Sequence, residues 1–112
     1  MNRVKLIQVR ASVQEPLRIV MDKVRATVSK VCGGIDDMQL LGNKALVIRA
    51  EIYPEKLPAL YTALTSIGIT INKQNLLDQD ALKEKLEHPI TLQITSFSDE
   101  TDSRVNIPKV PG

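Results

Sequence analysis

The sequence predicts a single α+β domain in which two helices pack on one face of an antiparallel sheet. The chain has 112 residues, of which 43% are hydrophobic, and this suits one soluble domain with its own core. Segments with alternating apolar residues and segments with helical spacing follow in the order strand, helix, strand, strand, helix, strand. The two halves of this order are similar, because each helix begins near a proline and is followed by Gly-Ile or Gly-Gly-Ile. These observations together predict the fold class.

The first strand and the first helix are predicted from the spacing of their apolar residues. Residues 5–13 alternate, as expected of a half-buried strand, and Pro16 then begins a helix. The inward residues of the strand are Ile7, Val9, Ala11 and Val13. The apolar stripe of the helix is Leu17, Val20, Met21, Val24, Val28 and Val31. Gly33 and Gly34 are expected to end the helix in the left-handed conformation.

A hairpin is predicted after the first helix. Residues 38–41 and 44–53 are its strands, and Gly42 and Asn43 form its turn, because both residue types accept tight-turn conformations. Alternate side chains of the second strand are expected to enter the core. These residues are Leu46, Ile48, Ala50 and Ile52.

A second helix and a fourth strand follow the hairpin. The helix is expected over residues 56–66, and Pro58 must lie in its first turn because proline lacks a backbone N–H. Its apolar stripe is Leu57, Leu60, Leu64 and Ile67. Gly68 ends the helix, and the strand begins at Ile69.

The order of elements over residues 5–77 is the split β-α-β pattern of ferredoxin-like folds. Within it, residues 54–71 combine a leucine-striped helix with the strand sequence Gly-Ile-Thr-Ile. This segment resembles the helix-to-strand part of ACT-type regulatory domains, and the resemblance implies a regulatory module. The Asp-x-x-Gly ligand turn of that family is missing here, so the resemblance assigns no ligand-binding residue.

A short helix, a fifth strand and a tail are predicted at the C-terminal end. Asp78 is expected to cap the helix, which His88 and Pro89 end. In the fifth strand, the apolar residues Ile90, Leu92 and Ile94 alternate with Thr91, Gln93 and Thr95. A lone strand leaves its backbone groups unpaired, so we expect it to extend a sheet edge of its own chain or of a second copy, a two-fold dimer being favoured. Residues 1–97 are thus the domain, with an extension from about residue 78, and residues 98–112 a flexible tail.

The sequence contains no pattern for cofactor or metal chemistry. The single cysteine, Cys32, and the single histidine, His88, exclude an internal disulfide, a cysteine-clustered zinc site and a histidine pair. Cys32 is expected at a helix C-terminus, where the negative end of the dipole raises its pKa, and His88 at the end of the short helix. Glycine-rich phosphate loops are absent, and the acidic residues near Asp78 lack EF-hand spacing. We therefore expect no cofactor, no metal and no catalytic residue.

The chain is expected in the cytoplasm, away from membranes. Its N-terminal residues lack an apolar stretch of signal-peptide length. The longest apolar run covers only residues 45–48, whereas about 20 residues are needed to cross a bilayer. The net charge is +2 and no run of five like charges exists, so a basic arm for nucleic acid is absent.

These observations favour a small non-catalytic regulatory or association module that binds itself, another protein or a small molecule. Apolar and basic residues interrupt the polar face of the predicted sheet that the helices leave uncovered. The candidate interaction face consists of Leu6, Arg10, Val47, Arg49, Tyr53 and Phe97.

Two other functions stay open at this point. One is an RNA-binding module, although such modules stack bases on sheet aromatics, of which the two central strands offer only Tyr53. The other is an acylphosphatase-like hydrolase that would use Arg18 and Asn43. In that case Glu15 and Pro16 occupy the position of the anion loop, where they add a negative charge and remove a donor.

Overall fold

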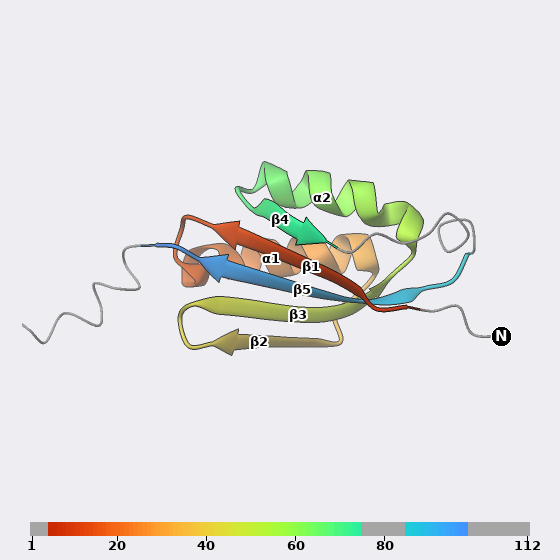
Figure 1. Cartoon of the computed structure of the whole chain (residues 1–112), viewed down its shortest axis with the longest axis horizontal. Helices are drawn as coiled ribbons and strands as arrows, with labels where there is room; N and C mark the ends of the chain where they lie inside the picture. The colour runs from red at the N-terminus through yellow and green to blue at the C-terminus, as the bar shows by residue number, and fades with distance from the viewer. Residues whose placement is uncertain (1–4, 75–84, 99–112) are drawn as a thin grey trace, which may run out of the picture.

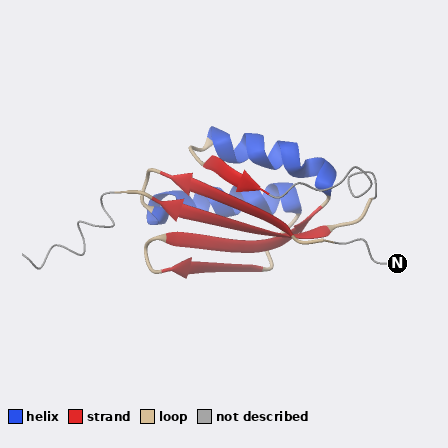
Figure 2. Ribbon diagram, viewed as in Figure 1, coloured by secondary structure: helices blue, strands red, loops and turns tan. Residues whose placement is uncertain are grey.

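Five strands form one mixed sheet, and two helices lie on one of its faces (Figures 1 and 2). The computed structural model describes residues 5–74 and 85–98. In chain order the elements are β1 (Ile7–Val13), α1 (Leu17–Cys32), β2 (Asp37–Leu41), β3 (Ala45–Ile52), the 3₁₀ turn η1 (Pro54–Lys56), α2 (Leu57–Ser66), β4 (Thr70–Gln74) and β5 (His88–Ser96). The α+β class expected from the sequence is confirmed.

The fifth strand lies in the middle of the sheet, and the expectation that it extends an edge was wrong. The strand order is β2-β3-β5-β1-β4, so β5 separates β1 from β3 (Figure 1). Residues 90–96 pair in parallel with β1, and residues 88–95 pair antiparallel with β3. The sheet is therefore mixed rather than antiparallel. The central position satisfies the backbone groups of β5 on both sides, which an edge position cannot do.

The predicted bounds of α1 agree with the structure to within one residue. Pro16 is the N-cap, with an extended backbone, and the helix ends at Cys32. Gly33 has a φ of 81° in the left-handed region, and its N–H donates to the carbonyl of Ser29 at 2.8 Å. Glycine adopts this conformation without the penalty that a Cβ would bring, so the chain turns sharply towards β2. In α2, Pro58 lies in the first turn, as expected.

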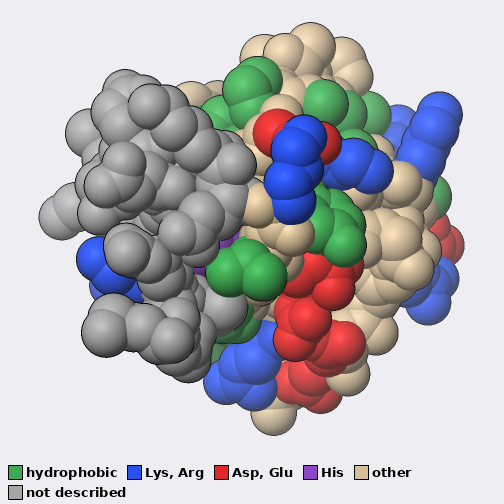
Figure 3. Space-filling view, turned by 90° about the vertical axis from the view of Figure 1, so that its right-hand side faces the viewer, with side chains coloured by type: hydrophobic (Ala, Val, Ile, Leu, Met, Phe, Trp, Pro, Cys, Tyr) green, Lys and Arg blue, Asp and Glu red, His purple; other side chains and the backbone are tan. Residues whose placement is uncertain are grey.

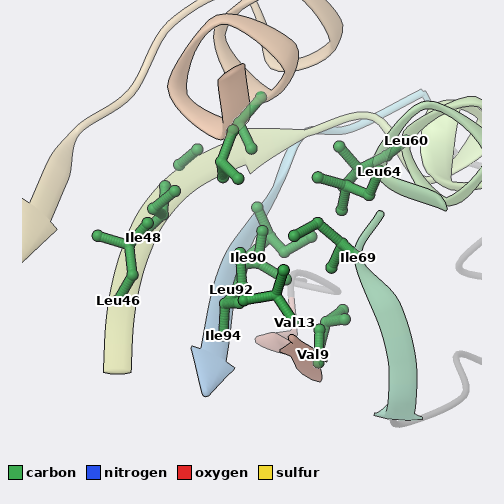
Figure 4. Packing of buried hydrophobic residues seen from close by; sticks show 14 of the residues in the cluster. Val9, Val13, Leu46, Ile48, Leu60, Leu64, Ile69, Ile90, Leu92 and Ile94 are labelled. Carbon is green, nitrogen blue, oxygen red and sulfur yellow. The ribbon is translucent and has the colours of Figure 1, made fainter. Parts of the chain in front are cut away.

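The core lies between the sheet and the two helices. All the inward residues predicted for β1 and β3 are buried. The helices add Leu17, Val20, Val24, Val28, Leu60 and Leu64. The buried side chains of β5 lie between Leu46 and Ile48 of β3 and Val9 and Val13 of β1 (Figure 4). One apolar cluster therefore joins every strand to one layer of helices, and no helix or strand of the described residues covers the opposite face of the sheet, which we call the uncovered face.

Two predicted C-terminal features fall largely outside the described residues. The expected helix from Asp78 is outside them as far as residue 84, and residues 85–87 have no regular secondary structure. The expected tail is outside them from residue 99. Ser98 itself is buried, and its N–H donates to the Ser96 hydroxyl at 3.2 Å.

Candidate functional site

The structure brings three of the six candidate face residues together on the uncovered face of the sheet. Arg10 of β1 is paired with Gln93, which is paired on its other side with Val47 of β3. Arg49 lies one row further along β3, opposite Thr91. Because residues paired across neighbouring strands point to the same face, these side chains form two adjacent rows opposite the helices.

The other three candidate face residues lie just beyond the strands, at the two ends of the sheet. Leu6 precedes β1 and Tyr53 follows β3, and both are exposed at the same end of the sheet. Phe97 follows β5 at the other end, where its N–H donates to the carbonyl of Val13 at 2.9 Å. Phe97 is exposed as well. The structure therefore separates Phe97 from the other two by the length of the sheet.

The middle of this face is a strip of uncharged polar side chains that the sequence did not assign to the site. Thr91, Gln93 and Thr95 are half-buried because a strand flanks β5 on each side. The sequence showed that these residues alternate with buried ones, but it did not show that their strand lies in the centre of the sheet. The strip offers hydroxyl and amide groups that both donate and accept hydrogen bonds.

One ion pair modifies the charge of the face. The Arg49 guanidinium donates to the Asp37 carboxylate of β2 at 3.2 Å, and both side chains are about half exposed. An exposed pair of this kind contributes about 0–1 kcal/mol to stability. Its larger effect is to neutralise positive charge beside β2. Arg10, on the β1 side, is exposed.

Cys32 and His88 do not form a nucleophile and base. Cys32 is the last residue of α1, and its pKa is raised to about 11, mainly because burial disfavours the thiolate. The Glu87 carboxylate raises this pKa further, and the Lys56 ammonium lowers it. The direction was expected from the sequence, but the main cause is burial rather than the helix dipole. A thiol with this pKa is protonated at neutral pH and is a poor nucleophile.

The expectation that His88 ends a helix was wrong, because His88 is the first residue of β5 and is 0% exposed. Its Nδ1 lies 3.0 Å from the backbone nitrogen of Lys5 and 3.2 Å from the Lys5 carbonyl oxygen. Its Nε2 is buried with no hydrogen-bond partner in the described part of the chain. Figure 3 views the end of the molecule at which β5 begins. The imidazole therefore belongs to the core.

The raised pKa makes the reactivity of Cys32 testable. Alkylation of the native protein with iodoacetamide at pH 8 is expected to be at least about tenfold slower than alkylation of the urea-unfolded chain, because fewer thiolates form. Because the folded pKa lies above the ordinary value of 9.0, the stabilising contribution of the neutral thiol is present below pH 9 and is lost as the pH rises towards 11. Equal alkylation rates for the native and the unfolded chain would contradict the raised pKa of Cys32.

The described residues give no sign of a membrane span or a metal centre. None of their helices combines the length and apolar character needed to cross a membrane. Nor do residues 5–74 and 85–98 bring three or more His, Cys, Asp or Glu side chains together as metal ligands. The chain matches no protein-family model, and no curated protein or solved structure matches it significantly.

Proposed function

We propose that this chain is a non-catalytic association module that binds another protein on the uncovered face of its sheet. The observation that carries the proposal is the composition of that face. A strip of threonine and glutamine side chains on β5 lies between Arg10 on one side and Val47 and Arg49 on the other. Arginine is enriched in protein interfaces, and their rims are polar. A partner surface with hydrogen-bonding groups in its middle and a carboxylate opposite Arg10 suits this arrangement.

A finer description of the fold belongs to the same proposal. We infer that β1 to β4 with their two helices are a ferredoxin-like unit into whose centre β5 is inserted. The strand order supports this interpretation. If β5 is left out, the order becomes β2-β3-β1-β4, in which each strand has the neighbours that it has in a ferredoxin-like sheet. The resemblance of residues 54–71 to ACT-type domains would make the association regulatory, and it rests on sequence pattern alone.

The uncovered face suits a protein better than RNA. Single-stranded RNA is recognised by stacking its bases on aromatic side chains of the sheet. The central rows of the face contain threonine, glutamine, valine and arginine, whereas Tyr53 and Phe97 lie beyond the strand ends. The positive side chains that an RNA backbone would need are partly neutralised, because Arg49 is paired with Asp37.

An acylphosphatase-like site has less support at the turn between β1 and α1. The Glu15 carbonyl there accepts a hydrogen bond from the Ser96 hydroxyl at 2.9 Å. Pro16 is the N-cap of α1 and contributes no N–H to an anion. The turn therefore presents a carboxylate where a phosphate would need donors.

A reversed charge at Arg10 and a new charge at Val47 test the proposal. The Arg10→Glu and Val47→Lys variants are expected to lose a partner that the wild type retains in capture from native lysate followed by quantitative mass spectrometry. A loss of about tenfold is expected for a residue at the centre of an interface. Lys23→Glu is the matched control, because Lys23 is an exposed residue of α1 on the other side of the sheet.

Two results would overturn the proposal. If every captured protein is retained equally by the wild type, both face variants and the control, the face is not a binding surface. If the wild type binds single-stranded RNA in a salt-sensitive manner and Arg10→Glu abolishes that binding, the RNA-binding alternative replaces the proposal.

A further inference from the structure

The edge strand β2 exposes both its backbone and apolar side chains. Among the residues that the structure describes, it pairs with β3 alone and ends the five-stranded sheet. Leu40 is 45% exposed and Leu41 is 50% exposed, although both belong to a strand. Unpaired N–H and C=O groups beside exposed leucines form a template on which another strand can pair.

The opposite edge of the sheet differs from β2. The pairing of β4 with β1 shifts register between Arg10 and Ala11, and such irregularities discourage a further strand from pairing. The exposed residues Thr70 and Asn72 of β4 are polar. β2 has neither a register shift nor a proline, and its sequence Asp-Met-Gln-Leu-Leu contains no lysine. By these criteria β2 is the unprotected edge.

We propose that β2 pairs antiparallel with β2 of a second copy, so that two five-stranded sheets become one sheet of ten strands. The two-fold axis passes between the Gln39 residues of the two copies, which is the register that pairs all five residues of β2. Met38 of each copy then lies opposite Leu40 of the other on the helix side of the sheet. This proposal goes beyond the proposed function and does not rest on it.

Charge distinguishes this arrangement from the alternatives. Asp37 is the only charged residue in β2. Antiparallel pairing keeps the two Asp37 carboxylates at opposite ends of the interface, whereas an in-register parallel pair would place them side by side. The same register sets the apolar Met38 of each copy opposite the apolar Leu40 of the other, so that β2 is complementary to itself. A second copy is therefore the better occupant.

The geometry also decides how the two copies are oriented. The two-fold axis is perpendicular to the sheet, so both helical layers lie on one side and both uncovered faces on the other. The contact is small, because only one short strand of each copy takes part, and small interfaces are weak and reversible. We therefore expect a dimer that dissociates on dilution.

Sedimentation equilibrium between about 1 µM and 1 mM tests the dimer. The wild type is expected to change from the mass of one chain, 12.4 kDa, towards twice that mass as its concentration rises. Leu40→Lys and, separately, Leu41→Lys are expected to weaken the dimer at least about tenfold, because a lysine on an edge strand opposes pairing. Ile19→Lys is the matched control, because Ile19 on α1 is also 45% exposed.

A disulfide trap tests the register independently of stability. In a Cys32→Ser background, Gln39→Cys is expected to give a covalent dimer on mild oxidation, because residues on the axis face each other. Thr70→Cys on β4 in the same background is expected to remain monomeric. A wild type that stays monomeric up to 1 mM, or equal trapping at the two edges, would overturn the proposal. The face variants can lose their captured partner and still dimerise. That result would leave both the proposed β2 dimer and its register standing, because the face variants do not change β2.

Discussion

Replacing Leu92 with alanine is expected to lower the free energy of unfolding by about 3 kcal/mol, one of the two largest effects of a single substitution that we predict for this chain. Leu92 is 2% exposed and lies in the middle of β5, between β1 and β3. Its removal leaves a cavity in the apolar cluster on the helix side of the sheet, and the structure around such a cavity closes it only in part. Urea denaturation followed by circular dichroism measures the change.

Thr91→Ala is the control for Leu92→Ala on the opposite face of the same strand. It shortens a half-buried side chain on the uncovered face and is expected to cost less than about 1 kcal/mol.

A chain that ends at Ser98 retains every described helix and strand and is expected to unfold cooperatively. A chain that ends at Glu87 lacks the strand between β1 and β3 and is expected not to fold. Cooperative unfolding of that shorter chain would show that β1 and β3 can pair without β5.

The local elements could be predicted from the sequence because their signals are local. Pro16 and Gly33 mark the ends of α1, and the alternation of residues 45–52 identifies the inward side of β3. Each of these features depends on residues that are close in sequence. For the same reason the outward position of Arg10, Val47 and Arg49 followed from period two alone.

The position of β5 could not be predicted in the same way. The alternation of residues 90–95 specifies which side chains are buried, but it says nothing about which strands lie on either side. The partners of β5 are about 80 residues away in β1 and about 40 residues away in β3. The one available signal was composition, since the outward residues Thr91, Gln93 and Thr95 are uncharged, as suits a strand with a neighbour on each side. Because the central position of β5 could not be predicted, the polar strip at the centre of the candidate face could not be predicted either.

The prediction for His88 was wrong because the dipeptide His-Pro is compatible with two different structures. A proline disfavours helical conformation in the residue before it, so the pair can end a helix or begin an extended strand. Here it begins β5, and Pro89 is paired with Glu51 of β3. The strand assignment places His88 opposite Ile52, in the core rather than in solvent.

The buried imidazole of His88 provides the second large effect that we expect. His88→Ala should lower the free energy of unfolding by about 2–4 kcal/mol, because it leaves a cavity and removes the side-chain partner of Lys5. His88→Leu fills most of the same volume. It also loses the hydrogen bond to Lys5, but it removes the Nε2 atom that has no partner in the described part of the chain.

The loss of one hydrogen bond and the removal of one unpartnered buried nitrogen have similar magnitudes and opposite signs. We therefore expect His88→Leu to lie within about 1 kcal/mol of the wild type in urea denaturation, and His88→Ala well below both. If leucine is as destabilising as alanine, the contact with Lys5 is the main contribution of His88, and its imidazole is held for hydrogen bonding rather than for volume. If leucine is clearly stabilising, the buried Nε2, which has no partner in the described part of the chain, destabilises the native protein at the start of its central strand.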